Sequence, residues 1–307
     1  MAKRYKKNWR TQPKVDHYQK ITDQILDNIA KTGTVPWQKP WNTPAGAARG
    51  IDGKPYRGIN SIMTNMQGYS DPRWATFNKI KQLGGMVKQG EKSTMITFFK
   101  PLFVQDKHAD GSPKVNDDGE KILKKISILK TFAVFNVEQA DIPNLPKLPK
   151  AKKQTKLGIR KAAEDVVKNR QNPAPITHNG GDRAYYLHGK DEIHMPPKSD
   201  FKGIDEYYDT LFHEIGHSTG HESRLNRHEM EGVHSRFGDK NYSKEELVAE
   251  FTGAFLGGVT GIKNQIQNNA TYIKGWSRAL KADKKLVIRA AGLGQKAADY
   301  ILEQPTK

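Results

Sequence analysis

The sequence predicts an α+β protein of two domains. Three observations indicate this: a first half in which helix-like and strand-like apolar periods alternate, a second half with mainly helical periods, and a segment rich in Pro and Lys between them. The chain has 307 residues, of which 36% are hydrophobic and 9% aromatic, so it is long enough for two ordinary cores. We predict a first domain over residues 1–140, a linker over 141–156 and a second domain over 157–307.

The first domain is predicted to begin with a helix over residues 18–30, because Ile and Leu recur there at three- and four-residue steps before a Thr-Gly stop. Asp71 and Pro72 predict the N-cap and first position of a second helix, which a Gly pair ends. Strand-like runs at residues 95–104 and 122–137 flank a loop rich in Asp and Gly. They predict a hairpin with a solvated tip.

The second domain is predicted to be mainly helical. Two short strands are expected near its start, between a first helix and a helix that carries a metal motif, and three further helices follow. The expected bounds are 157–170 for the first helix, 184–187 and 192–195 for the strands, about 201–215 for the motif helix, Ser243 for the start of the next, and 265–280 and 284–302 for the closing pair.

One motif indicates a metal site. Residues 213–217 read His-Glu-Ile-Gly-His, and two His side chains four residues apart on a helix can both reach one ion. Apolar residues at helical spacing upstream of the motif support a helix here. His213 and His217 are therefore predicted ligands. Glu214 is predicted to hold the attacking water of a zinc peptidase and to take its proton.

Catalytic zinc usually takes three protein ligands, so we expect a third one after the motif. His221 continues the four-residue spacing, but an unbroken helix carries it about 6 Å further along the axis than His217. It can bind only if the helix ends at Gly220. His228 and Glu229 lie in a polar stretch without periodicity, which is typical of a solvated loop. A glutamate on the following helix is the stronger alternative.

Ser243 and Glu246 have the spacing of a capping box, which predicts the start of that helix. Glu246 and Glu250 then share one helix face, and Glu250 precedes an apolar run in which an unpaired carboxylate is costly. In glutamate-ligated zinc peptidases the following helix supplies a ligand and, one turn later, an acid that orients the first metal His. We predict Glu246 as the third ligand and Glu250 as the orienting acid, with Glu250 as the alternative ligand.

The expected ion is Zn²⁺, with Mn²⁺ or another divalent ion as the alternative. Peptide hydrolysis also needs a donor for the developing oxyanion. Tyr242, His228 and His234 are the candidates for that donor, and the sequence does not rank them.

The charge is concentrated in the first half. The formal net charge is +18; residues 1–150 hold 26 basic and 13 acidic side chains (+13), and residues 151–307 hold 25 and 20 (+5). This asymmetry predicts a polyanionic partner for the first half and chemistry in the second. The chain has no Cys, which excludes disulfides and thiolate metal sites, and we find no apolar run long enough for a membrane anchor. We therefore expect a cytoplasmic protein without a membrane partner.

Aromatic and basic side chains interleave in the first half, as in proteins that stack rings on the bases of a single strand and place cations on its phosphates. Trp74 and Phe77 are expected in the core, because they lie on the apolar face of a predicted helix. The residues expected to bind DNA are Trp37, Lys39, Trp41, Tyr56, Arg57, Arg73, Lys79, Lys81, Lys88 and Lys92.

Motifs along nearly the whole chain resemble those of ArdC-type antirestriction proteins. In the first half they are residues 18–22 (YQKIT), 36–41 (PWQKPW), 56–60 (YRGIN), 74–77 (WATF) and 134–139 (VFNVEQ). In the second half they are residues 178–182 (HNGGD), 193–196 (IHMP), 213–221 (HEIGHSTGH) and 245–250 (EELVAE). Asn179 stands where Gly is common in that family, which does not affect a predicted ligand.

The resemblance implies a first domain that binds single-stranded DNA non-specifically and a zincin-like metallopeptidase domain, in a protein that protects incoming plasmid or phage DNA from host restriction. It also implies that antirestriction need not depend on the peptidase site. Two functions therefore stay open: a DNA-recruited metalloprotease acting on a protein on DNA or on the restriction machinery, and a DNA coat with an inactive metal domain. Glu214 favours the first, because a purely structural site needs no acid there.

Overall fold

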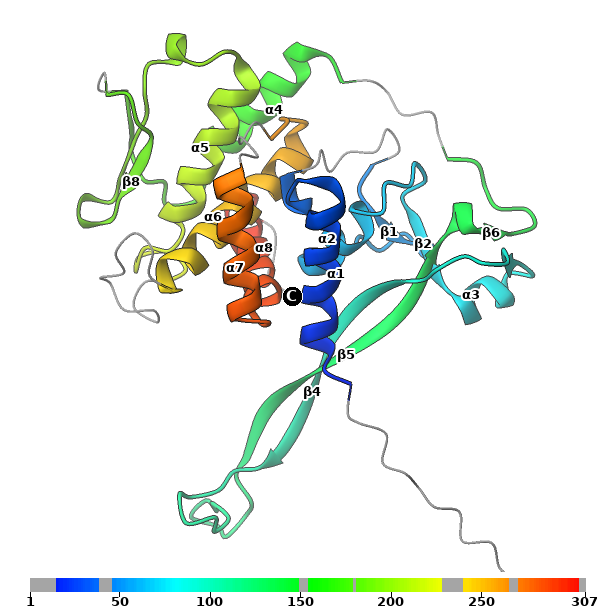
Figure 1. Cartoon of the computed structure of the whole chain (residues 1–307). Helices are drawn as coiled ribbons and strands as arrows, with labels where there is room; N and C mark the ends of the chain where they lie inside the picture. The colour runs from blue at the N-terminus through cyan, green and yellow to red at the C-terminus, as the bar shows by residue number, and fades with distance from the viewer. Residues whose placement is uncertain are drawn as a thin grey trace, which may run out of the picture.

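The computed structural model describes residues 15–38, 46–148, 154–178, 181–227, 240–264 and 270–303, with only the backbone described for residues 240–243. Its α-helices are α1 (His17–Thr32), α2 (Ile59–Asn65), α3 (Phe77–Gln82), α4 (Lys156–Lys168), α5 (Ile204–Ser218), α6 (Lys240–Thr260), α7 (Ala270–Ala282) and α8 (Leu286–Ile301). Its strands are β1 (Arg49–Gly50), β2 (Arg73–Thr76), β3 (Met86–Val87), β4 (Thr94–Gln105), β5 (Leu123–Asn136), β6 (Ala140–Asp141), β7 (Ile176–Thr177), β8 (Tyr185–Leu187) and β9 (Glu192–His194). Figure 1 shows the later helices gathered together and the hairpin β4–β5 projecting away from them.

The largest sheet belongs to the first half of the chain and has the strand order β1-β2-β5-β4. β4 pairs antiparallel with β5 along all of β4, from Thr94 opposite Val134 to Gln105 opposite Leu123, which confirms the predicted hairpin. β2 pairs with the inner end of β5, where Thr76 lies opposite Val134. Within the described residues, the outer part of the hairpin is therefore a two-stranded ribbon.

The prediction of a helix starting at Pro72 is wrong. Residues 73–76 form β2, in which the Trp74 side chain is buried, and α3 begins only at Phe77, whose side chain is 53% exposed. Thr76 caps α3, because its Oγ1 accepts a hydrogen bond from the backbone N–H of Lys79 at 3.2 Å. Trp74 packs against Val134 in a cluster of its own. The contact with Val134 of β5 favours an extended backbone for residues 73–76. The apolar spacing within the segment itself does not contain this information.

The second half contains the predicted helices and short strands, with β7 as an additional strand that was not predicted and with a different start for α6. α6 begins at Lys240, so Ser243 lies inside the helix and the predicted N-cap there is wrong. Glu246 and Glu250 remain one turn apart on α6, because a residue four positions on lies on the same face. α6 packs between α5 and α8, and a small sheet of order β7-β9-β8 lies beside α5.

Elements from the two halves share one hydrophobic core. Side chains of α1, α2 and the 3-10 helix η1 (Pro36–Gln38), including Ile21, Trp37 and Ile62, belong to the same buried cluster as those of α5 to α8. Hydrogen bonds also join the two halves. Thr22 Oγ1 donates to the Lys284 carbonyl at 2.9 Å, and the Gly58 N–H donates to Gln295 Oε1 at 3.0 Å. The predicted domain bounds stay a prediction, and the first helices are packed as part of the helical half.

Candidate metal centre

The two histidines of the predicted metal site lie on α5. Its buried face consists of Tyr207, Tyr208, Leu211, Phe212 and Ile215. His213 and His217 occupy the adjoining stripe, which faces α6. A Cβ added at Gly216 would lie 3.0 Å from the Ala249 Cα, so the glycine inside the motif allows α5 and α6 to approach closely.

Three side chains converge at this helix pair. His213 Nε2 and His217 Nε2 lie 3.0 Å apart. Glu246 on α6 reaches both, with Oε2 at 3.5 Å from His213 Nε2 and Oε1 at 3.4 Å from His217 Nε2. Among the described residues, His213, His217 and Glu246 form the group of possible metal ligands.

The geometry of this group fits a divalent ion. Three donor atoms at about 2.0–2.1 Å from one tetrahedral ion lie roughly 3.3 Å from one another, and the measured separations of 3.0, 3.5 and 3.4 Å bracket that value. Two imidazoles and one carboxylate are a donor set typical of catalytic zinc, which leaves the fourth position for water. The predicted choice of Glu246 over Glu250 agrees with this geometry.

The ionisation of the three groups is strongly coupled. Burial lowers the pKa of His217, but contacts with Glu245 and Glu246 outweigh burial and raise this pKa to about 10. Burial likewise opposes protonation of His213, and its contact with Glu246 raises the pKa above the ordinary value. Burial raises the pKa of Glu246, and the contacts with both imidazoles lower it below its usual range. The carboxylate is thus held in its charged form, as a ligand must be.

Glu214 is 7% exposed and lies on α5 between the two histidines. Its charge contributes to the raised pKa of both imidazoles. A carboxylate in that position can accept a proton from a water molecule bound to the ion. The role of Glu214 that the motif predicts stays a prediction.

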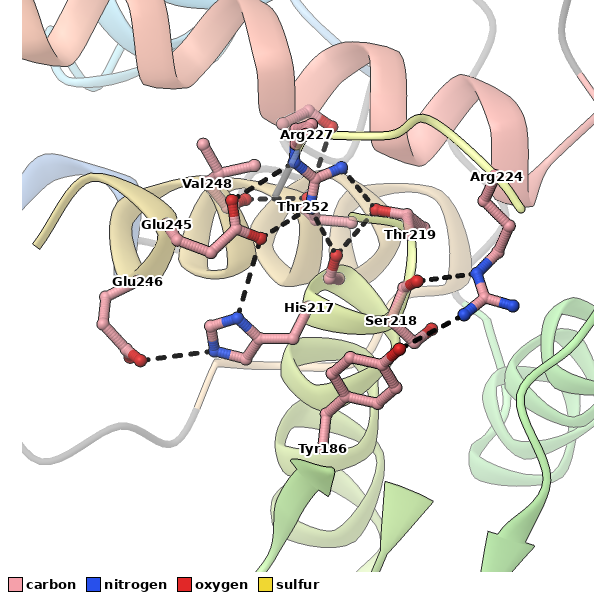
Figure 2. A network of polar contacts seen from close by, with 12 residues as sticks. Tyr186, His217, Ser218, Thr219, Arg224, Arg227, Glu245, Glu246, Val248 and Thr252 are labelled. Atoms are coloured by element: carbon pink, nitrogen blue, oxygen red, sulfur yellow. Dashed lines mark hydrogen bonds and ion pairs between the residues drawn. The ribbon is translucent and has the colours of Figure 1, made fainter. Parts of the chain in front are cut away.

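Glu245 and Arg227 complete the site, and the sequence analysis assigned neither of them a role. Glu245 Oε1 lies 3.7 Å from His217 Nδ1 and accepts from Arg227 Nη2 at 2.6 Å. Arg227 is 4% exposed and also donates to Thr219 Oγ1 at 2.7 Å, as Figure 2 shows, and to the Gly216 carbonyl at 2.9 Å. Burial raises the pKa of Glu245, but His217 and Arg227 lower it to about 2. Glu245 is therefore the acid placed to orient His217.

Arg227 belongs to the same polar stretch as His228 and Glu229 and is buried, whereas Glu222 and Ser223 are exposed. His228 and Glu229, which were interpreted as solvated loop, lie outside the described residues. The sequence contained one signal for a buried cation such as Arg227, the pair of adjacent glutamates near the start of α6. Two carboxylates near a buried helix contact need a cation. His221 does not join the ligand group: its Nδ1 lies 2.8 Å from Ser223 Oγ.

Glu250 has a different environment from the one predicted. It is 5% exposed and accepts hydrogen bonds from Trp37 Nε1 at 2.7 Å and from the Tyr272 hydroxyl. His213 Nδ1, which Glu250 was expected to orient, is buried and has no hydrogen-bond partner among the described residues. Burial raises the pKa of Glu250, while Tyr272 and the charge of His213 oppose that rise. Glu250 is thus held by Trp37 from the first half of the chain and by Tyr272 of α7.

Of the predicted DNA-binding residues that the structure describes, some are buried or held by acidic side chains. Trp37 is 0% exposed, with its ring against Phe251 and Trp276, so the prediction that it stacks on a base is wrong. The sequence around Trp37 is typical of an exposed loop, because the residues that bury Trp37 lie more than 200 positions further along the chain. Arg57 is bound to Asp299, and the guanidinium of Arg73 donates to Asp71 Oδ2 at 2.7 Å.

The other predicted DNA-binding residues differ in exposure. Tyr56 is half-buried; Lys79, Lys81, Lys88 and Lys92 are exposed, and Lys88 lies 3.9 Å from Asp141. Lys39, Trp41, His228 and His234 lie outside the described residues, as does the side chain of Tyr242. The exposed lysines alone do not supply the aromatic surface that the sequence analysis expected.

None of the described helices combines the length and the apolar character that a bilayer crossing requires.

Two family models match the chain in succession. Residues 15–135 match the N-terminal domain of the anti-restriction factor ArdC, and residues 161–293 match a zincin-like metallopeptidase family. The two-domain α+β architecture is thereby confirmed.

The chain is also similar to proteins of known name or structure. It is 36% identical over 307 residues to a DNA primase TraC of Escherichia coli, in an alignment that covers 97% of this chain but 20% of the primase. The metal-free crystal structure of the antirestriction protein ArdC from plasmid R388 superposes with a TM-score of 0.70 at 35% identity, covering 94% of this chain and 98% of that one. The Mn(II)-bound structure of that protein gives 0.69 at 34% identity. With matches of this extent in both halves, the chain belongs to the ArdC family of antirestriction proteins.

Proposed function

We propose that this protein binds single-stranded DNA non-specifically, carries a metal-dependent peptidase site and protects incoming plasmid or phage DNA from restriction in the cytoplasm. The observation that supports the peptidase site most directly is the convergence of His213, His217 and Glu246 within hydrogen-bond distances, with Glu214 buried beside them. The net charge of +13 over residues 1–150 supports the DNA partner.

The protein residues have distinct roles in the proposed hydrolysis. His213, His217 and Glu246 would hold the ion, which would lower the pKa of a water molecule and polarise the peptide carbonyl. Glu214 accepts the proton of the attacking water and delivers it to the leaving amine. Glu245 keeps His217 in the ligating orientation, because its carboxylate faces Nδ1. Tyr242, His228 and His234 remain the proposed oxyanion donors.

Zn²⁺ is the proposed ion, because the two-His, one-Glu donor set is typical of zinc peptidases. Mn²⁺ is the alternative, since the related plasmid R388 protein has been crystallised with Mn(II). The protein substrate is proposed to be bound to DNA or to belong to the restriction machinery, because DNA binding by the first half would bring the peptidase site to such proteins.

The proposal is tested with Glu214→Gln, which keeps the size of the side chain and removes its basicity. The variant should retain the metal and single-stranded DNA binding but lose hydrolysis of a DNA-bound protein substrate and protection of transferred DNA in a restricting recipient. Full protection by this variant, together with an absence of hydrolysis by the wild type, would instead support the DNA coat with an inactive metal domain.

A further inference from the structure

The outer part of the hairpin β4–β5 is an exposed ribbon with an unusual composition. We define it as residues 98–105 and 123–130. Figure 1 shows that it extends beyond the rest of the protein. Its exposed apolar side chains include Phe98 at 55% and Phe103 at 61%. A two-stranded hairpin without a cover is at best marginally stable, and an exposed apolar surface of this kind indicates a binding site.

The charges of this ribbon have one sign. Residues 98–105 and 123–130 contain four lysines and no Asp or Glu. Lys124 is 3.1 Å from Asp106, whereas Lys100, Lys125 and Lys130 are exposed and have no ion-pair partner among the described residues. The tip, residues 106–122, differs, with five acidic residues against three lysines. The positive charge is thus confined to the paired strands.

The strand register divides these side chains between two faces. Residues opposite each other, and residues two apart, share a face. One face, which we call the lysine face, carries Phe98, Lys100, Leu102 and Val104 of β4 with Lys124, Ile126, Ile128 and Lys130 of β5. The opposite face carries Phe99, Pro101, Phe103 and Gln105 with Leu123, Lys125, Ser127 and Leu129. Three of the four lysines therefore lie on the lysine face, and they alternate with apolar side chains.

The opposite face is partly covered by the protein itself. Leu129 is 7% exposed and belongs to the main core, and next to it Thr131 Oγ1 lies 3.0 Å from His17 Nδ1 of α1. The lysine face combines the larger positive charge with an exposed ring at Phe98.

We propose that the lysine face is a binding surface for single-stranded DNA, with Phe98 stacked on a base and Lys100 and Lys130 against phosphates. This inference rests on the proposed DNA-binding function and assigns its location. Single strands offer unstacked bases to rings and phosphates to cations in alternation. A duplex presents only its phosphates to such a surface, and an apolar protein partner would bury the lysines unpaired. Eight residues of strand span roughly 26 Å, enough for about four to seven nucleotides.

The test measures binding of the full-length protein to a fluorescent single-stranded oligothymidylate by anisotropy at several salt concentrations. Phe98→Ala should weaken binding about 5- to 150-fold, the effect of losing one stacked base. Lys130→Gln should reduce the slope of log affinity against log salt by about 0.7, the value for one phosphate contact to a single strand. Phe103→Ala and Lys125→Gln, the matched controls on the opposite face, should change neither quantity appreciably.

The outcomes separate this inference from the proposed function. If the wild type binds no single-stranded DNA, the proposed DNA-binding function fails. If the wild type binds and the lysine-face variants bind equally well, the function stands and the location is wrong. Lys79→Gln combined with Lys81→Gln tests the rival surface on α3, and a larger loss there than at Phe98 would also overturn the inference. Because Phe98 is exposed, circular dichroism of its variant should show an unchanged fold.

Discussion

Replacing Trp37 by Phe removes an indole N–H while keeping an aromatic ring in the shared core. This N–H donates to Glu250 Oε2 at 2.7 Å, with Trp37 0% and Glu250 5% exposed. A hydrogen bond to a charged group contributes about 1.5–3 kcal/mol, and leaving a buried partner unsatisfied costs a similar amount. Because Tyr272 still donates to Glu250, we expect about 2 kcal/mol from the hydrogen bond, and the smaller ring adds about 1 kcal/mol for the cavity.

Urea unfolding followed by circular dichroism measures this loss, with Trp74→Phe as the matched control. Trp74 is 2% exposed and belongs to a separate cluster with Val134, so its replacement loses packing outside the Glu250 network. The free energy of unfolding should therefore fall about 2 kcal/mol further in Trp37→Phe than in Trp74→Phe. Equal losses in the two variants would show that the hydrogen bond between the halves does not stabilise the fold, and would refute the reasoning.

Three further predictions concern the metal site and the buried acid behind it. His213→Ala should abolish binding of one divalent ion per chain, and Glu246→Ala should weaken metal binding more than Glu250→Ala does. Elemental analysis of the purified variants measures this. A larger loss of metal in Glu250→Ala than in Glu246→Ala would contradict the ligand assignment. Arg227→Ala should leave Glu245 buried without its cation. Metal affinity, measured by chelator competition, should fall about 10- to 100-fold, and the free energy of unfolding, measured in urea, should fall by about 3–5 kcal/mol. Unchanged metal affinity would mean that Glu245 does not orient the ligand His217. Burial raises the pKa of Glu250 above its ordinary value of 4.5, so the folded state disfavours the charged form of this side chain. The free energy of unfolding of the wild type should therefore fall relative to that of Glu250→Gln as pH rises above 4.5. A difference in unfolding free energy that stays constant across pH would contradict this.

Local periodicity was sufficient where one element carries the information. The helix with the HExxH motif, the hairpin, α1 and the closing helices were all predicted, because their apolar residues repeat with the period of the element. The errors lie where a distant contact decides. Trp74 is in a strand because it packs against Val134 of β5, and Trp37 is buried because α6 and α7 surround it. A sequence window around either tryptophan contains none of these partners.

By itself, the sequence determined the two histidines and the acid between them, because a four-residue step on a helix brings two side chains to one face whatever the rest of the chain does. It also determined the uneven charge and the hairpin. Only the tertiary structure decided the roles of Glu245, Glu246 and Glu250. Neighbouring helix positions point in different directions, so the packing of α6 against α5 brings Glu246 to both histidines and Glu245 to His217, and it places Glu250 between Trp37 and Tyr272.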